Sequence, residues 1–135
     1  MLVEHARNLA GITDAAHAEY GLGGTPVITL LECSLQDQRI TVELVPGSLL
    51  EKLHGAARVV ENTTCSYGLR PEVQHIAGEH GMRIAATDDT GEVRAIERSD
   101  HPFFVGTLYQ PQLRSAPGAP HPIFAGLLEA AHAAT

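Results

Sequence analysis

Two cysteines and eight histidines are the side chains in this sequence that could act as nucleophiles, bases or metal ligands. Flanking glycines would allow the tight turn that exposes a nucleophilic sulfur. Cys33 in LLECSL and Cys65 in NTTCSY have no flanking glycine and form no CxxC pair. Neither a nucleophile, a disulfide framework nor a cysteine zinc site is predicted, and we expect both to be ordinary buried thiols.

The histidines do not show a metal-binding spacing. His75 and His80 are five residues apart, and no two histidines have the i, i+4 spacing that places two imidazoles on one helical face. His101 and His121 each precede a proline, which favours a role in fixing the backbone of loops or helix caps. The sequence therefore predicts no metal site and no cofactor.

Composition limits the classes of protein that remain. A chain of 135 residues fits one domain, and 44% hydrophobic against 19% charged residues indicates a packed globule. A formal charge of -7 excludes the basic surface that nucleic acid requires. Glu4 and Arg7 interrupt the first apolar stretch, so neither a signal peptide nor a membrane span is expected there. We expect a cytoplasmic protein.

The elements that would position any site alternate between helices and strands. Helices are predicted over 2–10, from a Ser48/Glu51 capping box through Leu53, over 71–80 with Val73, Ile76 and Ala77 buried, and over 122–134 with Ile123, Phe124, Leu127, Leu128 and Ala131 on one stripe. Strands are predicted at 27–31, 40–45, 57–61, 82–87, 93–97 and 103–109. The first two strands would form a hairpin through SLQDQ, and 12–25 would be a loop. This interleaving favours an α/β fold.

Two segments resemble a known family. Residues 101–131, HPFFVGTLYQPQLRSAPGAPHPIFAGLLEAA, have the flanking motifs of the family's closing stretch: His-Pro before a strand, an Arg-Ser-x-Pro run and an HPxFAG run. Residues 3–20, VEHARNLAGITDAAHAEY, resemble a segment just beyond the family's nucleophilic cysteine. On these motifs the chain resembles the C-terminal portion of a CTP synthase-like class I glutamine amidotransferase domain.

The resemblance implies a partial flavodoxin-like class I amidotransferase fold, with a central mixed sheet flanked by helices. The opening helix starts at Met1 with its apolar face already in register. Residues 1–135 are therefore expected to be a single, N-terminally truncated domain that begins just after the nucleophile elbow. A missing set of strands would leave an exposed edge that needs a partner or a homodimer.

The catalytic triad of the family is degenerate in this chain. The family's corner reads His-Pro-Glu, whereas here it reads Gln110-Pro111-Gln112. A carboxamide has no nitrogen that accepts a proton near neutral pH, so Gln110 cannot replace the base, and Gln112 replaces the carboxylate that orients it. With the nucleophile also absent, the resemblance implies a domain that does not hydrolyse glutamine.

The glutamine pocket is expected to be only partly retained. Glu19 matches the family's carboxylate that pairs with the amino group of glutamine. The family's run of arginines and histidines before a tyrosine reads here Asn62-Thr63-Thr64-Cys65-Ser66-Tyr67, without a cation. Losing the charge-assisted bond to the glutamine carboxylate removes about 1.5–3 kcal/mol, so weak or no glutamine binding is expected.

Three functions remain open from the sequence. The first is a catalytically inactive homologue that serves as a binding or regulatory module, with a possible protein partner or homodimer. The second is a fragment of a longer, glutamine-hydrolysing CTP synthase type enzyme of pyrimidine nucleotide biosynthesis. The third is a remnant without a selected function. An intact nucleophile elbow encoded upstream in frame would favour the second.

Overall fold

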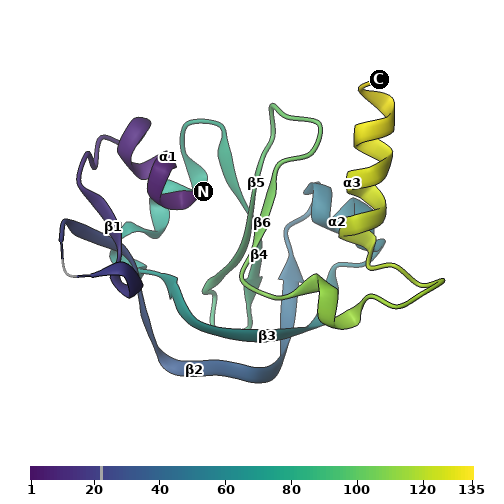
Figure 1. Ribbon diagram of the computed structural model, residues 1–135, viewed down its shortest axis with the longest axis horizontal. Coiled ribbons are helices and arrows are strands. Elements are labelled where there is room, and N and C mark those ends of the chain that lie inside the picture. Colours follow the sequence, from purple (N-terminus) through teal and green to yellow (C-terminus); the bar gives the residue numbers. More distant parts are fainter. Residues whose placement is uncertain (22) are drawn as a thin grey trace.

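A six-stranded mixed sheet forms the centre of the molecule (Figure 1). The computed structural model describes residues 1–21 and 23–135, apart from the side chain of Cys33. The strands are β1 (Ala15–His17), β2 (Thr25–Leu44), β3 (Arg58–Leu69), β4 (Met82–Asp88), β5 (Val93–Arg98) and β6 (Val105–Thr107). The strand order is β1-β2-β4-β5-β6, and β3 pairs with β2. Only β1 and β2 are parallel among these pairs, so the expected α/β fold with a mixed sheet is confirmed.

The hairpin expected through SLQDQ is wrong, because β2 runs as one strand through that segment. The sequence there contains neither glycine nor proline, and the chain does not turn back. Instead the pairing with β3 shifts register on both sides of Leu35, and Asp37 adopts a positive φ of 51°. Such irregularities bend a strand without ending it. The antiparallel partner of β2 is β3, which follows after the segment 45–57 and extends to Leu69, well beyond the predicted 57–61.

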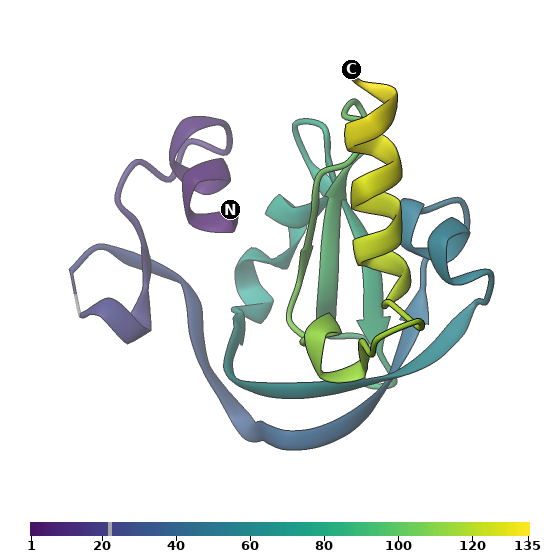
Figure 2. The same ribbon diagram turned by 45° about the vertical axis from the view of Figure 1, so that its right-hand side comes forward.

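The long β2–β3 ribbon curves beneath the rest of the molecule and connects its two ends (Figures 1 and 2). At one end it pairs in parallel with β1, and at the other β2 pairs with β4. Strands β4 and β5 match their predicted ranges closely. Strand β6 is shorter than the predicted 103–109, because only Val105, Gly106 and Thr107 pair with β5.

Two groups of helices cover different ends of the sheet (Figure 1). Helix α1 (Leu2–Asn8) and the 3-10 helix η2 (Pro71–Gly78) pack with the β1 end, while α2 (Leu49–His54) and α3 (Pro122–Ala133) pack together at the other. The helix expected over 71–80 is therefore a 3-10 helix with a kink at Val73. Its buried residues are Ile76 and Ala77, as predicted, and Val73 is partly buried.

Helix α3 begins as predicted but buries a narrower face. Ile123 and Gly126 are buried, whereas Leu127 and Leu128 are 47% and 71% exposed, which corrects the expected apolar stripe. A Cβ at position 126 would collide with the side chain of Leu53. The small residue thus allows α3 to pass close to α2 at its first turns.

The segment expected to be a loop over 12–25 contains β1 and the 3-10 helix η1 (Ala18–Tyr20). Positive φ at Gly21 and Gly24 brings the chain back so that β1 and β2 run in parallel. The capping box of α2 is confirmed in part: Glu51 N–H donates to Ser48 Oγ over 3.0 Å, and the Glu51 carboxylate accepts from Gly47 N–H. No helix in the described ranges is long and apolar enough to span a bilayer.

Candidate functional site

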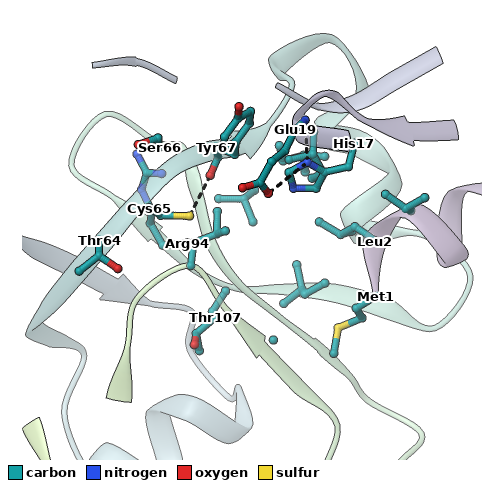
Figure 3. Close-up of a pocket in the computed structure, with 18 of the residues that line it drawn as sticks. Met1, Leu2, His17, Glu19, Thr64, Cys65, Ser66, Tyr67, Arg94 and Thr107 are labelled. Carbon is teal, nitrogen blue, oxygen red and sulfur yellow. Dashed lines mark hydrogen bonds and ion pairs between the residues drawn. The ribbon is translucent and has the colours of Figure 1, made fainter. Parts of the chain in front are cut away.

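A cavity of about 420 Å³ lies between α1, η1 and the strands β3, β5 and β6. Its walls are mostly aliphatic, and its polar groups include side chains from η1, the middle of β3 and one end of β5, together with His17, Gln36 and Thr107. The residues that carry the argument are Glu19, Thr64, Cys65, Tyr67 and Arg94. Figure 3 shows these side chains around the cavity, with Met1 and the first residue of α1, Leu2, on another side.

Glu19 is held at the cavity by the residue two positions before it. His17 caps η1, because its Nδ1 accepts the Glu19 N–H over 3.2 Å, and the Glu19 carboxylate lies 4.0 Å from the same ring nitrogen. The imidazole packs against Tyr20 and Tyr67, each with ring centroids 5.2 Å away. The sequence-predicted carboxylate therefore faces a cavity, with 53% of its side chain exposed.

The β3 segment opposite offers hydrogen-bonding groups and a thiol but no cation of its own. Cys65 lies within a strand, is half-buried, and its sulfur donates to the Tyr67 carbonyl over 3.2 Å. This is not the strand-to-helix elbow that a nucleophile needs. Cys33 also falls within a strand, and the expectation that its thiol is buried lies outside the described residues.

Arg94 is a cation that lines the cavity, yet it is committed to other partners. Its side chain is 4% exposed, and its guanidinium pairs with Asp88 over 2.6 Å and with Glu92 over 2.7 Å. Burial would raise the pKa of Asp88, but hydrogen bonds from Thr90 and Arg94 outweigh it and hold that pKa below its usual value. A ligand carboxylate at this site would have to compete with two protein carboxylates.

Gln110 is pinned to β3 by both its side chain and its backbone. Its Oε1 accepts the Thr64 N–H over 2.7 Å, and its own N–H donates to the Asn62 carbonyl over 2.9 Å. Gln112 lies in the 3-10 helix η3 (Pro111–Arg114) and is exposed. Gln110 thus does not line the cavity itself but hydrogen-bonds to Thr64, which does. Gln112 does not line the cavity either.

The two histidines before prolines have the capping roles that were expected. His101 Nδ1 accepts the Phe103 N–H over 3.1 Å, and His121 Nδ1 accepts the Ile123 N–H over 3.3 Å at the start of α3. His121 also takes part in a cluster that sequence reasoning missed. His54, Glu61 and His121 bring their potential ligand atoms within 4.8 Å of one another. Their separation along the chain offered no spacing signal that could have revealed it.

The sequence of this chain is similar to the sequences of known CTP synthases. The chain is 38% identical to the CTP synthase of Synechococcus sp. (strain WH7803) over 96% of its own length, and 34% identical to that of Methanopyrus kandleri over 97%. It spans about a quarter of the length of these relatives, 26% in each case. No protein-family model matches the chain.

Solved structures agree with the sequence comparison. The glutaminase domain of Trypanosoma brucei CTPS with bound acivicin superposes with a TM-score of 0.84 at 25% identity, over 97% of this chain and 56% of that one. A putative GMP synthase protein from Thermoplasma acidophilum shares the fold, with a TM-score of 0.57 at 11% identity over 78% of this chain and 48% of that one. The chain is therefore similar in sequence and fold to the glutaminase part of CTP synthases.

Proposed function

We propose that this CTP synthase-like glutamine amidotransferase domain does not hydrolyse glutamine and acts as a binding or regulatory module. The observation that carries the proposal is Gln110, which occupies the position where the resemblance expects the general base. Its amide oxygen accepts a hydrogen bond from Thr64 N–H. A carboxamide in that role supports the backbone and cannot take a proton from a thiol.

The two other catalytic roles are also unfilled among the described side chains. Cys65 lies in the middle of β3 and donates its thiol to a carbonyl, so it is neither exposed at an elbow nor paired with a base. Gln112 is exposed on η3 and carries no charge. The domain would retain its shape because its corner is held by backbone hydrogen bonds, while acid–base chemistry is lost.

Glutamine itself should bind weakly. Glu19 can pair with an α-amino group, but the cation that would receive the α-carboxylate is missing from the β3 run, and Arg94 is already neutralised by Asp88 and Glu92. A bound glutamine would therefore have a partner for its α-ammonium group but none for its α-carboxylate.

The test is ammonia release from glutamine by the purified chain, measured next to glutamine binding by calorimetry. We expect neither turnover nor micromolar affinity. Glu19→Gln is the matched variant for binding, since it keeps the shape and removes the charge. Turnover by the wild-type chain, or micromolar affinity that Glu19→Gln abolishes, would contradict the respective part of the proposal.

A second candidate is that the chain functions as part of a longer CTP synthase type enzyme. Its alignment to 26% of the Synechococcus protein favours this possibility. The mass of the native protein from its source cells would decide it. Even in that setting the glutamines at 110 and 112 are internal, so added upstream residues would supply at most the nucleophile.

A partner or homodimer is also proposed, on the exposed apolar side chains of Leu127 and Leu128 on α3. Size-exclusion chromatography with light scattering would report the oligomeric state. A dimer that Leu128→Glu dissociates would support self-association through α3, whereas a wild-type monomer would leave only a heterologous partner. Aggregation of the wild-type chain would favour a missing segment or a remnant without a selected function.

A further inference from the structure

A second group of polar side chains lies away from the cavity, where α2, β3 and α3 meet. His54 is the last residue of α2, Glu61 lies on β3, and His121 is the N-cap of α3. The imidazole rings of the two histidines stand nearly perpendicular, with centroids 5.2 Å apart. Each of the three residues can offer one ligand atom, and these atoms lie within 4.8 Å of one another.

The hydrogen bonds within this cluster are incomplete. Glu61 is fully buried, and its Oε1 accepts from Arg114 Nη1 over 2.8 Å and from His121 Nε2 over 3.2 Å. Its Oε2 and the Nε2 of His54 are buried without a hydrogen-bond partner in the part of the chain that the structure describes. Buried polar atoms are almost always paired, so two such atoms in one cluster require an explanation.

We propose that His54, Glu61 and His121 bind a zinc ion. Two imidazole nitrogens and one carboxylate oxygen are a set of three protein ligands that zinc accepts, with its fourth position left for water or another small ligand. A hollow of about 320 Å³ adjoins the two histidines and provides room for that ligand; its other walls include Val59, Arg114 and Pro120. Zinc would engage a nitrogen and an oxygen that the protein leaves unpartnered.

Metal binding would change two existing contacts. His121 Nδ1 accepts the Ile123 N–H, so Nε2 carries the ring proton that is donated to Glu61. Zinc at Nε2 requires the tautomer with the ring proton on Nδ1, so that proton moves from Nε2 to Nδ1 and the weak 3.3 Å cap bond from Ile123 N–H is lost. Arg114 also competes for Glu61, but its side chain is 43% exposed and can turn toward solvent.

The competing explanation is an ion-pair network that needs no metal. Arg114 could balance the Glu61 charge while the neutral His121 ring donates its Nε2 proton to the carboxylate, and the unpartnered atoms would then be a tolerated cost. The two explanations differ in what Arg114 does. In the zinc explanation Arg114 opposes binding, so removing its charge strengthens zinc affinity. In the ion-pair explanation removing it only destabilises the fold.

The experiment uses the chain stripped of metal with a chelator, followed by zinc titration in a calorimeter and cobalt absorption spectra as a probe of tetrahedral geometry. We expect one zinc ion per chain and a tetrahedral cobalt spectrum. His54→Asn should weaken zinc binding by roughly 10- to 100-fold or more, and Arg114→Met should strengthen it. His132→Asn is the matched control, because this exposed histidine lies on α3 outside the cluster.

Circular dichroism of each variant keeps the test independent of misfolding, and His54 is chosen because it is less buried than Glu61. Zinc bound equally by wild type and His54→Asn would overturn the proposal and mark the binding as adventitious, through other histidines or cysteines. Absence of zinc binding by folded wild-type chain would also overturn it and leave the ion-pair network as the explanation.

Discussion

Gly24 lies where β1, which leads to Glu19 of the candidate site, begins to pair with β2, and replacing it gives the sharpest test of the structure. It precedes β2, has a φ of +86°, and lies so close to Asp14 that a Cβ would collide with the Asp14 carbonyl oxygen. That oxygen accepts the Thr25 N–H over 2.9 Å, and the Asp14 carboxylate accepts from Thr25 Oγ1 over 3.0 Å. These contacts start the parallel pairing of β1 with β2, and β1 leads directly to Glu19.

Gly24→Ala should therefore be destabilising for two reasons. A residue with a Cβ loses about 1–2 kcal/mol in the left-handed region, and separating the two backbones costs the Thr25 bond, about 0.5–1.5 kcal/mol. Together these give about 1.5–3.5 kcal/mol. For a domain of this size, roughly 3–5 °C of melting temperature correspond to each kcal/mol, so the expected decrease is about 5–18 °C.

The assay is thermal unfolding followed by circular dichroism, with Gly23→Ala as the matched control. Gly23 is adjacent in sequence, its φ is outside the left-handed region, and no described atom lies within 4 Å of the place where a Cβ would stand. That variant should melt close to wild type. If the two variants melt at the same temperature, the close approach of residue 24 to Asp14 is wrong, and so is the β1–β2 pairing built on it.

Three further predictions concern single groups. Burial and the neighbouring His121 lower the pKa of His54 below its usual 6.5. In the metal-free chain the unfolded state therefore takes up a proton at a higher pH than the folded state, and the free energy of unfolding should fall as pH drops below about 6.5. His54→Gln should reduce the slope of this pH dependence. The pKa of Asp88 is lowered, so the stability it contributes is present above about pH 3.8 and lost as pH falls further; Asp88→Asn should flatten that acid limb. Ser48→Ala removes the N-cap of α2 and should cost about 1 kcal/mol in urea unfolding, against little change for the exposed Ser99→Ala.

Each of these three has a result that would contradict it. A pH profile that His54→Gln leaves unchanged would mean that the imidazole is equally easy to protonate in both states. An acid limb that survives Asp88→Asn would show that Arg94 does not depend on this carboxylate. Equal stability of Ser48→Ala and Ser99→Ala would mean that the cap is satisfied by solvent.

Much of the fold could be predicted where local signals coincide with tertiary packing. The Ser48 cap, the Pro122 helix start and the turn between β4 and β5 depend on residues a few positions apart, and all three are present in the structure. The strand 103–109 was overestimated because apolar residues fit a strand or an irregular buried segment equally well, and pairing with β5 decides between them. The buried width of the apolar stripe on α3 was overestimated, because α2 contacts α3 along the narrow face that contains Gly126 and leaves Leu127 and Leu128 exposed.

The sequence by itself determined the helical caps, the family resemblance and the replacement of a base by Gln110, since these follow from residue identity and short spacing. Tertiary structure alone decided that β2 continues through SLQDQ, that Gln110 donates and accepts along β3, and that His54, Glu61 and His121 meet. The physical reason is that a polar segment such as SLQDQ can form either a turn or an irregular stretch of strand, and pairing with a strand distant in sequence, here β3, decides between them. Contacts across 60 residues likewise depend on how three elements pack, which no local pattern encodes.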